Sequence, residues 1–91
     1  MSKPQARFED LVEFPSLFVF RALGAASADL HQRCVRSVEQ HLDRRVESVE
    51  TAPSSKGAYV AVRVGVIVTS ADEIRSTYDL LAKVEGIRMV L

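Results

Sequence analysis

The sequence lacks several features that would each indicate a class of protein. It has one cysteine, Cys34, so an internal disulfide is impossible, as is typical of a reducing compartment. No apolar run approaches the roughly 18 residues of a membrane-spanning helix, and the N-terminus lacks the apolar core of a signal peptide. Twelve Lys and Arg residues balance twelve Asp and Glu residues, which disfavours a broad nucleic-acid surface. We therefore expect a cytoplasmic protein without a membrane anchor.

Length and composition indicate one globular domain. The chain has 91 residues, of which 47% are hydrophobic and 26% charged, and these values are untypical of disorder or of a coiled coil. A chain this short buries about 60 to 65% of its unfolded surface. That is enough for one modest core, and it disfavours a large enclosed active site.

The N-terminal region is expected to lie outside the main domain. Residues 1–6 are polar, and Phe8, Leu11 and Val12 then recur at the spacing of one helical turn. Pro15 ends this turn, because the residue before a proline is pushed out of the helical region. We expect residues 1–15 to form a tail with a short helical turn and residues 16–91 to form the domain.

Four segments have strand patterns. The clearest is 59–68, in which Val occupies five alternate positions. Residues 16–23 are rich in Phe, Val and Leu and stop at Gly24, whereas 45–52 alternate only weakly. A terminal strand over 87–91 follows Gly86.

Two segments between these strands have helix patterns. In residues 28–42, Leu30, Cys34, Val38 and Leu42 fall four apart, and Ser27 is positioned to cap the helix. The second helix, from Ala71 to about Lys83, turns Ile74, Tyr78 and Leu81 inward, with Val84 just beyond its end. It follows a Ser-x-x-Glu capping box formed by Ser70 and Glu73.

The element order β-α-β-β-α-β predicts an α+β fold, the ferredoxin-like sandwich. In this architecture two helices cover one face of a four-stranded antiparallel sheet, and the first and third strands are central. The opposite face is left uncovered. We look for function on that face.

Alternation along the strands predicts which side chains reach the uncovered face. With the valines, Phe18 and Phe20 inward, the residues Tyr59, Arg63 and Arg21 point outward. In the last strand we place Ile87, Met89 and Leu91 inward and Arg88 and Val90 outward. The candidate ligand or partner surface is therefore Arg21, Arg63, Arg88 and Tyr59, with Gly24 in the loop beside it.

Three interpretations of this surface remain open. Arginine side chains often lie over an exposed sheet with their heads in water, without any ligand. An apolar uncovered face also favours a partner protein or a second copy of the chain. The arginine forks suit a carboxylate or a phosphate, so a small metabolite is the third possibility.

The turn between the two middle strands has two interpretations. Ser54, Ser55, Lys56 and Gly57 offer hydroxyls, amides and an ammonium group to an anion. The same residues are ordinary hairpin chemistry, in which Gly57 supplies a positive φ. The spacing is not that of a phosphate-binding P-loop, and we favour the plain turn.

Catalytic and metal-binding patterns are weak. His31, Cys34 and His41 lie on one helix, but two or three scattered ligands do not make a tetrahedral site. Cys34 falls on the apolar stripe, where it acts as a small hydrophobe. The acidic pairs at residues 9–10 and 72–73 stand at helix starts, where they complement the helix dipole. We expect no enzyme activity, no metal and no cofactor.

Several short segments together resemble the YbeD-like family of small bacterial proteins of unknown function. They are Phe14-Pro15, Phe18, the strand end from Arg21 to Gly24, Pro53-Ser54-Ser55-Lys56-Gly57 with Tyr59, and Arg88-Met89-Val90-Leu91. The resemblance runs from about Phe8 to Leu91. It implies an ACT-like domain, similar to amino-acid-sensing regulatory modules of metabolic enzymes, and it carries over no catalytic residues.

Together these inferences predict a noncatalytic regulatory or adaptor domain that takes part in the control of metabolism. It would bind a partner protein, a second copy of itself as a dimer, or a small carboxylate-bearing metabolite. The alternative is an RNA-binding domain that uses the uncovered face. RNA-recognition domains stack bases on aromatic residues there, and this chain offers only Tyr59, so we expect no nucleic-acid partner.

Overall fold

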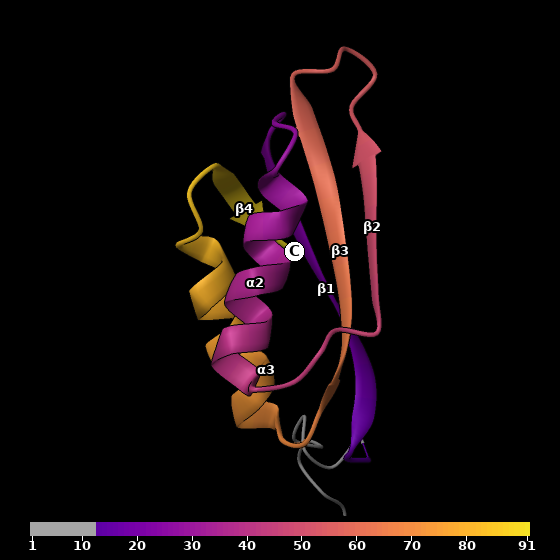
Figure 1. Cartoon of the computed structure of the whole chain (residues 1–91), viewed down its shortest axis with the longest axis vertical. Coiled ribbons are helices and arrows are strands. Elements are labelled where there is room, and N and C mark those ends of the chain that lie inside the picture. Colours follow the sequence, from indigo (N-terminus) through magenta and orange to yellow (C-terminus); the bar gives the residue numbers. More distant parts are fainter. Residues whose placement is uncertain (1–12) are drawn as a thin grey trace, which may run out of the picture.

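The computed structural model describes residues 13–91 (Figure 1). Within them the chain forms four strands and two helices in the expected order. Their bounds are β1 (Ser16–Ala25), α2 (Leu30–Leu42), β2 (Ser48–Pro53), β3 (Tyr59–Val68), α3 (Ala71–Ala82) and β4 (Ile87–Val90). In this part of the chain, no helix has the length and apolar character needed to cross a membrane. The expected helical turn around Phe8, Leu11 and Val12 lies outside the described residues.

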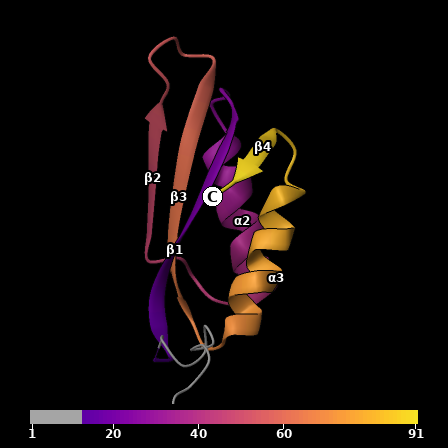
Figure 2. The ribbon, with the colours of Figure 1, turned by 180° about the vertical axis from the view of Figure 1, so that it is seen from behind.

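The strands form one antiparallel sheet in the order β2-β3-β1-β4, so β3 and β1 are central. Both helices lie on the same side of this sheet, as the two opposite views show (Figures 1 and 2). The hairpin of β2 and β3 extends past the helices at one end. This arrangement confirms the expected ferredoxin-like sandwich with one uncovered side.

Alternation along the central strands builds the core, as expected. Val62, Val64, Val66 and Val68 of β3 and Phe20 of β1 are at most 1% exposed, and all five lie under the helices. We call the sheet side that carries these five residues the covered face. Each helix packs an apolar stripe on it, made of Leu30, Cys34, Val38 and Leu42 in α2 and of Ile74 and Leu81 in α3.

The core of α3 differs in one position from the expectation. Tyr78 is half-buried and meets Phe20 edge-on, with ring centroids 5.0 Å apart, and burial raises the pKa of its phenol. Thr77, which the apolar spacing did not include, is fully buried. Its Oγ1 has no hydrogen-bond partner among the described residues. Because this hydroxyl makes no hydrogen bond there, Thr77 stabilises the core mainly through the packing of its methyl group.

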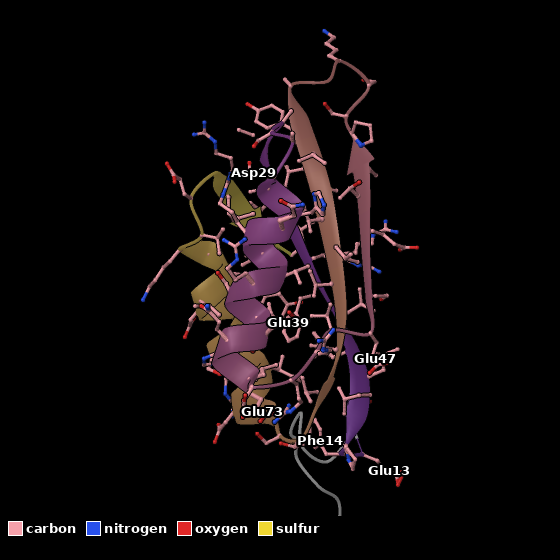
Figure 3. The ribbon with its side chains drawn as sticks, viewed as in Figure 1. Glu13, Phe14, Asp29, Glu39, Glu47 and Glu73 are labelled. Carbon is pink, nitrogen blue, oxygen red and sulfur yellow. The ribbon has the colours of Figure 1, made fainter. Side chains whose placement is uncertain are left out.

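Helix α2 begins two residues later than expected, and Ser27 does not cap it. Its hydroxyl donates to the carboxylate of Asp29 at 2.6 Å, and Asp29 takes the capping position without a side-chain bond to the helix backbone (Figure 3). Arg33 also donates to this carboxylate, at 2.5 Å. The hydrogen bonds from Ser27 and Arg33 hold the pKa of Asp29 below its usual value.

The start of α3 confirms half of the capping box and adds a clamp. Ser70 Oγ accepts from the Glu73 amide at 3.1 Å, but the Glu73 carboxylate accepts from the amide of Thr69, at 2.7 Å. The guanidinium of Arg44, just after α2, grips the same carboxylate at 2.6 and 2.8 Å and donates to the Ile67 carbonyl (Figure 3). This ion pair lowers the pKa of Glu73 to about 2. The clamp fixes the end of α2 against the start of α3.

Strand β4 corrects the expected facing of its side chains. Val90 pairs with Ala22 and packs on the core, whereas Met89 pairs with Leu23 and is 49% exposed. Both were expected to point the other way. The register shifts by one residue next to Gly24, and such a bulge reverses simple alternation.

Strand β2 also differs in its bounds, since it was expected over residues 45–52. The Val46 amide donates to the Glu39 carboxylate at 2.9 Å instead of to a strand, and Val46 packs against the core. Pairing begins at Ser48 opposite Gly65 and runs to Pro53 opposite Val60. All six residues of β2 are exposed, so this edge strand contributes little to the core.

Candidate functional site: the open face of the sheet

The side of the sheet away from the helices carries a mixed apolar and basic surface. Residues that alternate with the core positions, or that pair directly with such residues, lie on it. Leu17, Val19 and Tyr59 are 54%, 41% and 46% exposed there. We call this surface the open face; its residues are Leu17, Val19, Arg21 and Leu23 of β1, Ser48, Glu50 and Ala52 of β2, Tyr59, Ala61, Arg63, Gly65 and Ile67 of β3, and Met89 of β4.

Two arginines meet at the centre of the open face. Arg21 of β1 and Arg63 of β3 are direct cross-strand partners, and both are exposed. Directly opposite residues have Cβ atoms about 5 Å apart, so an anion held between the two side chains is within reach of both positive charges. Within residues 13–91, neither guanidinium has a hydrogen bond or an ion pair. The pair can therefore accept a carboxylate or phosphate without breaking an existing contact.

Glu50 lies on the other side of Arg63. Strand β2 pairs Glu50 with Arg63, which sets a carboxylate, then two guanidinium groups, in one row across three strands. A shallow hollow of about 380 Å³ lies beside this row, lined by Glu50, Thr51, Ala52, Ala61 and Arg63. Its lining combines one acidic and one basic side chain with a threonine and two alanines.

Apolar side chains flank the arginine pair at both ends. Toward the start of β1 lie Leu17 and Ile67, which pair with each other. Toward the end of β1, Leu23 pairs with Ala61 on one side and with Met89 on the other. The charged row therefore crosses the middle of a surface whose other side chains are mostly apolar.

The structure changes the predicted residue set in two places. Gly24 is not on the open face: it is buried on the helix side, where an added Cβ would lie 2.6 Å from the Gly86 carbonyl oxygen. Arg88 is exposed but lies at the register shift of β4, and Met89 takes the place beside Leu23. Arg21, Arg63 and Tyr59 are all on the open face, but Tyr59 lies four strand positions from the two arginines.

Glu50 and Met89 are among the residues of this surface that the sequence did not place there. The hairpin register contains the signal for Glu50, since a turn that pairs Pro53 with Val60 also pairs Glu50 with Arg63. The bulge that places Met89 outward has no comparable pattern in the sequence.

The turn between β2 and β3 has the hydrogen bonds of an ordinary hairpin loop. Gly57 has φ of +73°, and its amide donates to the Ser54 carbonyl at 2.9 Å. The Ser54 amide donates to the Tyr59 carbonyl, and the Ser54 hydroxyl accepts from the Tyr59 amide. These groups are occupied within the loop, so they are not free to form an anion nest. Ser55 and Lys56 are exposed at its tip.

Catalytic and metal-binding candidates do not come together. Cys34 is fully buried, and burial raises the pKa of its thiol, so it is not an activated nucleophile. No three His, Cys, Asp or Glu side chains in residues 13–91 lie close enough to hold a metal ion. His41 contacts the Ser76 hydroxyl at 2.8 Å on the exposed side of the helices. No other hydrogen bond orients this imidazole in the part of the chain that the structure describes.

Sequence comparison identifies relatives of the chain. The family described as "Protein of unknown function (DUF493)" matches residues 9–91. A UPF0250 protein of Shewanella oneidensis is 41% identical over 85 residues, which cover 93% of this chain and 96% of that protein. The similarity therefore includes the whole sheet and both helices.

Solved structures with the same architecture agree. The solution structure of protein HP0495 from H. pylori matches with a TM-score of 0.78 at 13% identity, covering 100% of this chain and 97% of that one. The ACT domain from GTP pyrophosphokinase of Chlorobium tepidum matches with a TM-score of 0.62 at 19% identity, covering 82% of this chain and 94% of that domain. At such low identities the likeness shows the fold alone, and that fold is ACT-like.

Proposed function

The chain belongs to the DUF493 family of proteins of unknown function, and we propose that it is a noncatalytic regulatory or adaptor domain that acts by binding. Its ligand is a partner protein or a small carboxylate-bearing metabolite, held on the open face. One observation carries this proposal: Arg21 and Arg63 lie directly opposite each other at the centre of an uncovered apolar surface.

A binding role agrees with the chemistry of the chain. Nucleophilic catalysis needs a nucleophile, a base and a group that orients the base. The buried Cys34 and the exposed contact of His41 with Ser76 do not form such a set. The arginine pair, in contrast, offers planar donors for a bidentate carboxylate. The ACT-like fold supports a regulatory role by analogy, since the solved ACT domain is part of a GTP pyrophosphokinase.

RNA binding is less well supported than carboxylate binding. Single-stranded RNA is recognised on such sheets by bases stacked on aromatic side chains. Tyr59 is the one aromatic residue in 13–91 that is strongly exposed, and it lies at the start of β3, away from the arginine pair.

Two measurements on the full chain test the proposal. In the first, the isotope-labelled protein is titrated with pooled amino acids, small organic acids and a short single-stranded RNA, and amide shifts are followed by NMR. In the second, immobilised protein captures partners from an extract of its own host. We expect at least one to give binding that Arg63→Gln removes. Arg36→Gln, which removes an exposed arginine of α2 on the helix side, is the matched control.

The outcomes separate the ligand classes. Saturable shifts of the Arg21 and Arg63 amides with an organic acid identify a metabolite sensor. Captured proteins that depend on Arg63, without any such shifts, identify an adaptor. If every small acid and every captured protein binds Arg63→Gln as well as it binds the wild type, the open face is not the site and the proposal is wrong.

A further inference from the structure

We propose that the open face docks a segment of a partner protein in which one or two carboxylates stand between apolar side chains. This inference rests on the proposed function and narrows it, since it chooses a protein segment over a small metabolite. It follows from the extent of the surface, the position of the arginine pair and the absence of neutralising carboxylates on most of that surface.

The extent of the surface favours a protein segment. Leu17 and Tyr59 stand at opposite ends of the ten-residue strands β1 and β3, and both are about half exposed. Strands spaced about 4.8 Å apart with a rise of about 3.3 Å per residue give this face a flat area of roughly 500 Å². Side-chain relief raises that area toward the roughly 600 to 800 Å² that each partner contributes to a small protein interface. A metabolite that sits in the hollow beside Arg63 would leave Leu17 and Met89 uncovered.

The position of the arginine pair disfavours a second copy of the chain. Arg21 is one of the two inner residues among the four open-face residues of β1, and Arg63 is the middle one of the five on β3. A two-fold axis through the centre of the surface would therefore stack the arginines of one copy on those of the other. Like charges that face each other across a desolvated contact are strongly unfavourable. The occupant has to bring negative charge to the centre, and a second open face does not.

The charges on the open face define the partner's chemistry. Arg21 and Arg63 contribute two positive charges, and Glu50 contributes one negative charge on the outer side of Arg63. Arg21 is thus the less neutralised of the two guanidinium groups. A carboxylate placed between them satisfies both forks and removes their mutual repulsion.

The apolar flanks define the rest of the segment. Leu17 and Ile67 lie four strand positions from the arginine row, which is about 13 Å, and Leu23 and Ala61 lie two positions away, about 7 Å. An occupant needs apolar groups at both distances, on opposite sides of its carboxylate. A free amino acid or a small dicarboxylate does not span them, whereas a peptide segment does.

A display experiment on the full chain tests this. A phage-displayed library of random dodecapeptides is panned against the wild-type protein, and enriched peptides are synthesised for titration. We expect enriched sequences with Asp or Glu between apolar residues, and amide shifts on both central strands. Replacing the acid by its amide should weaken binding by roughly tenfold or more, since hydrogen bonds to charged groups are lost.

Protein variants complete the test. Arg21→Gln and Arg63→Gln should each weaken the peptide by about tenfold or more, Arg63→Lys by less, because lysine keeps the charge and loses the fork. Leu17→Ser should also weaken peptide binding, because it removes an apolar contact at the far flank. A metabolite-sized ligand would not reach Leu17, so its binding should not change. Arg36→Gln should bind as the wild type does. Sedimentation velocity on the same variants measures any self-association.

Contrary outcomes are distinct. No enriched motif, or peptides that bind independently of Arg21 and Arg63, overturns the inference. If small acids shift the open face and no acidic peptide does, the inference fails and the proposed binding function stands. A dimer whose contact covers the open face, or salt-sensitive RNA binding there, also overturns the inference.

Discussion

The two faces of the sheet are formed by the same strands, yet their side chains differ in composition and exposure. On the covered face, Val62, Val64, Val66 and Val68 are at most 1% exposed and purely aliphatic. On the open face, one residue away in each strand, Arg21 opposes Arg63 and Leu17 is 54% exposed. Burial of apolar area accounts for the first pattern.

Burial does not account for the second pattern. Two arginines at directly opposite positions of neighbouring strands do not stabilise the fold, and exposed Leu and Met side chains gain little from folding. The comparison teaches that burial explains the composition of the covered face and does not explain that of the open face. Binding is the role for which an uncovered, charged and apolar surface is suited. Substitutions on the two faces should therefore differ in the property that they change.

The largest contrast is expected at Phe20 and Leu17 of the same strand. Phe20 is fully buried against Phe18 and Tyr78, so Phe20→Ala should cost about 3 to 5 kcal/mol of unfolding free energy. Leu17→Ala on the open face should stay within about 0.5 kcal/mol of the wild type. Urea denaturation followed by circular dichroism measures both. A large loss with Leu17→Ala would show that the open face is also composed for stability.

Two glycines sharpen the comparison at backbone level. A Cβ at Gly24 would lie 2.6 Å from the Gly86 carbonyl oxygen and 2.7 Å from Leu30 Cδ2, and neither can move freely in the core. Gly24→Ala should therefore cost about 1 to 3 kcal/mol. A Cβ at Gly65 on the open face would meet Ser48 Oγ at 2.5 Å, but that hydroxyl is exposed and can rotate away.

We expect Gly65→Ala to cost less than half as much as Gly24→Ala in the same urea experiment. The doubly substituted protein with Ser48→Ala separates the hydroxyl contact from any backbone effect, because it removes the group that the new methyl meets. Equal costs at Gly24 and Gly65 would contradict the difference between a packed and an open face.

The helix side should also set the response to acid, through Glu73. Its carboxylate is held by Arg44, which lowers its pKa to about 2 from an ordinary value of 4.5. A depressed folded-state pKa contributes stability that is present above pH 4.5 and is lost as the pH falls toward 2. The side chains of the pair are 30% and 23% exposed, so solvent screening reduces the expected contribution to about 1 kcal/mol.

Thermal unfolding between pH 7 and pH 2 measures this dependence. Glu73→Gln should lower the stability at pH 7 and flatten its loss between pH 4.5 and 2. Asp72→Asn, which removes an exposed neighbouring carboxylate that pairs with Arg75 and not with Arg44, is the matched control. An unchanged acid response with Glu73→Gln would mean that the clamp adds nothing to stability.

The sequence predicted the covered face well, because a periodic pattern repeats there over many residues. Five alternating valines and an apolar helix stripe fix which side of the strand faces the helices, because a shift by one residue would turn every valine outward. The family resemblance was also confirmed, over nearly the whole chain. The same periodicity placed Arg21, Arg63 and Tyr59 on the open face.

The sequence failed where a single local event decides the geometry. The bulge in β4 exchanges the expected sides of Met89 and Val90, and one extra residue leaves no periodic trace in a four-residue strand. Gly24 was expected in a loop that contacts the ligand. Its close packing against Gly86 and Leu30 instead explains why a glycine stands at this position. Glu50 was missed because β2 has no buried residue to fix its alternation.

The smallest expected effect is at the arginine pair, and its sign decides between folding and binding as the reason for that pair. Arg21→Gln removes one of two like charges that lie directly opposite, so the unfolding free energy should be unchanged or should rise by a few tenths of a kcal/mol. Because both guanidinium groups are exposed, any gain should shrink at high salt. Urea midpoints at low and high salt measure this, with Arg36→Gln as the control. A loss above about 1 kcal/mol would mean that Arg21 is held for stability. A gain accompanied by lost peptide binding would mean that the open face keeps an unfavourable charge pair for its ligand.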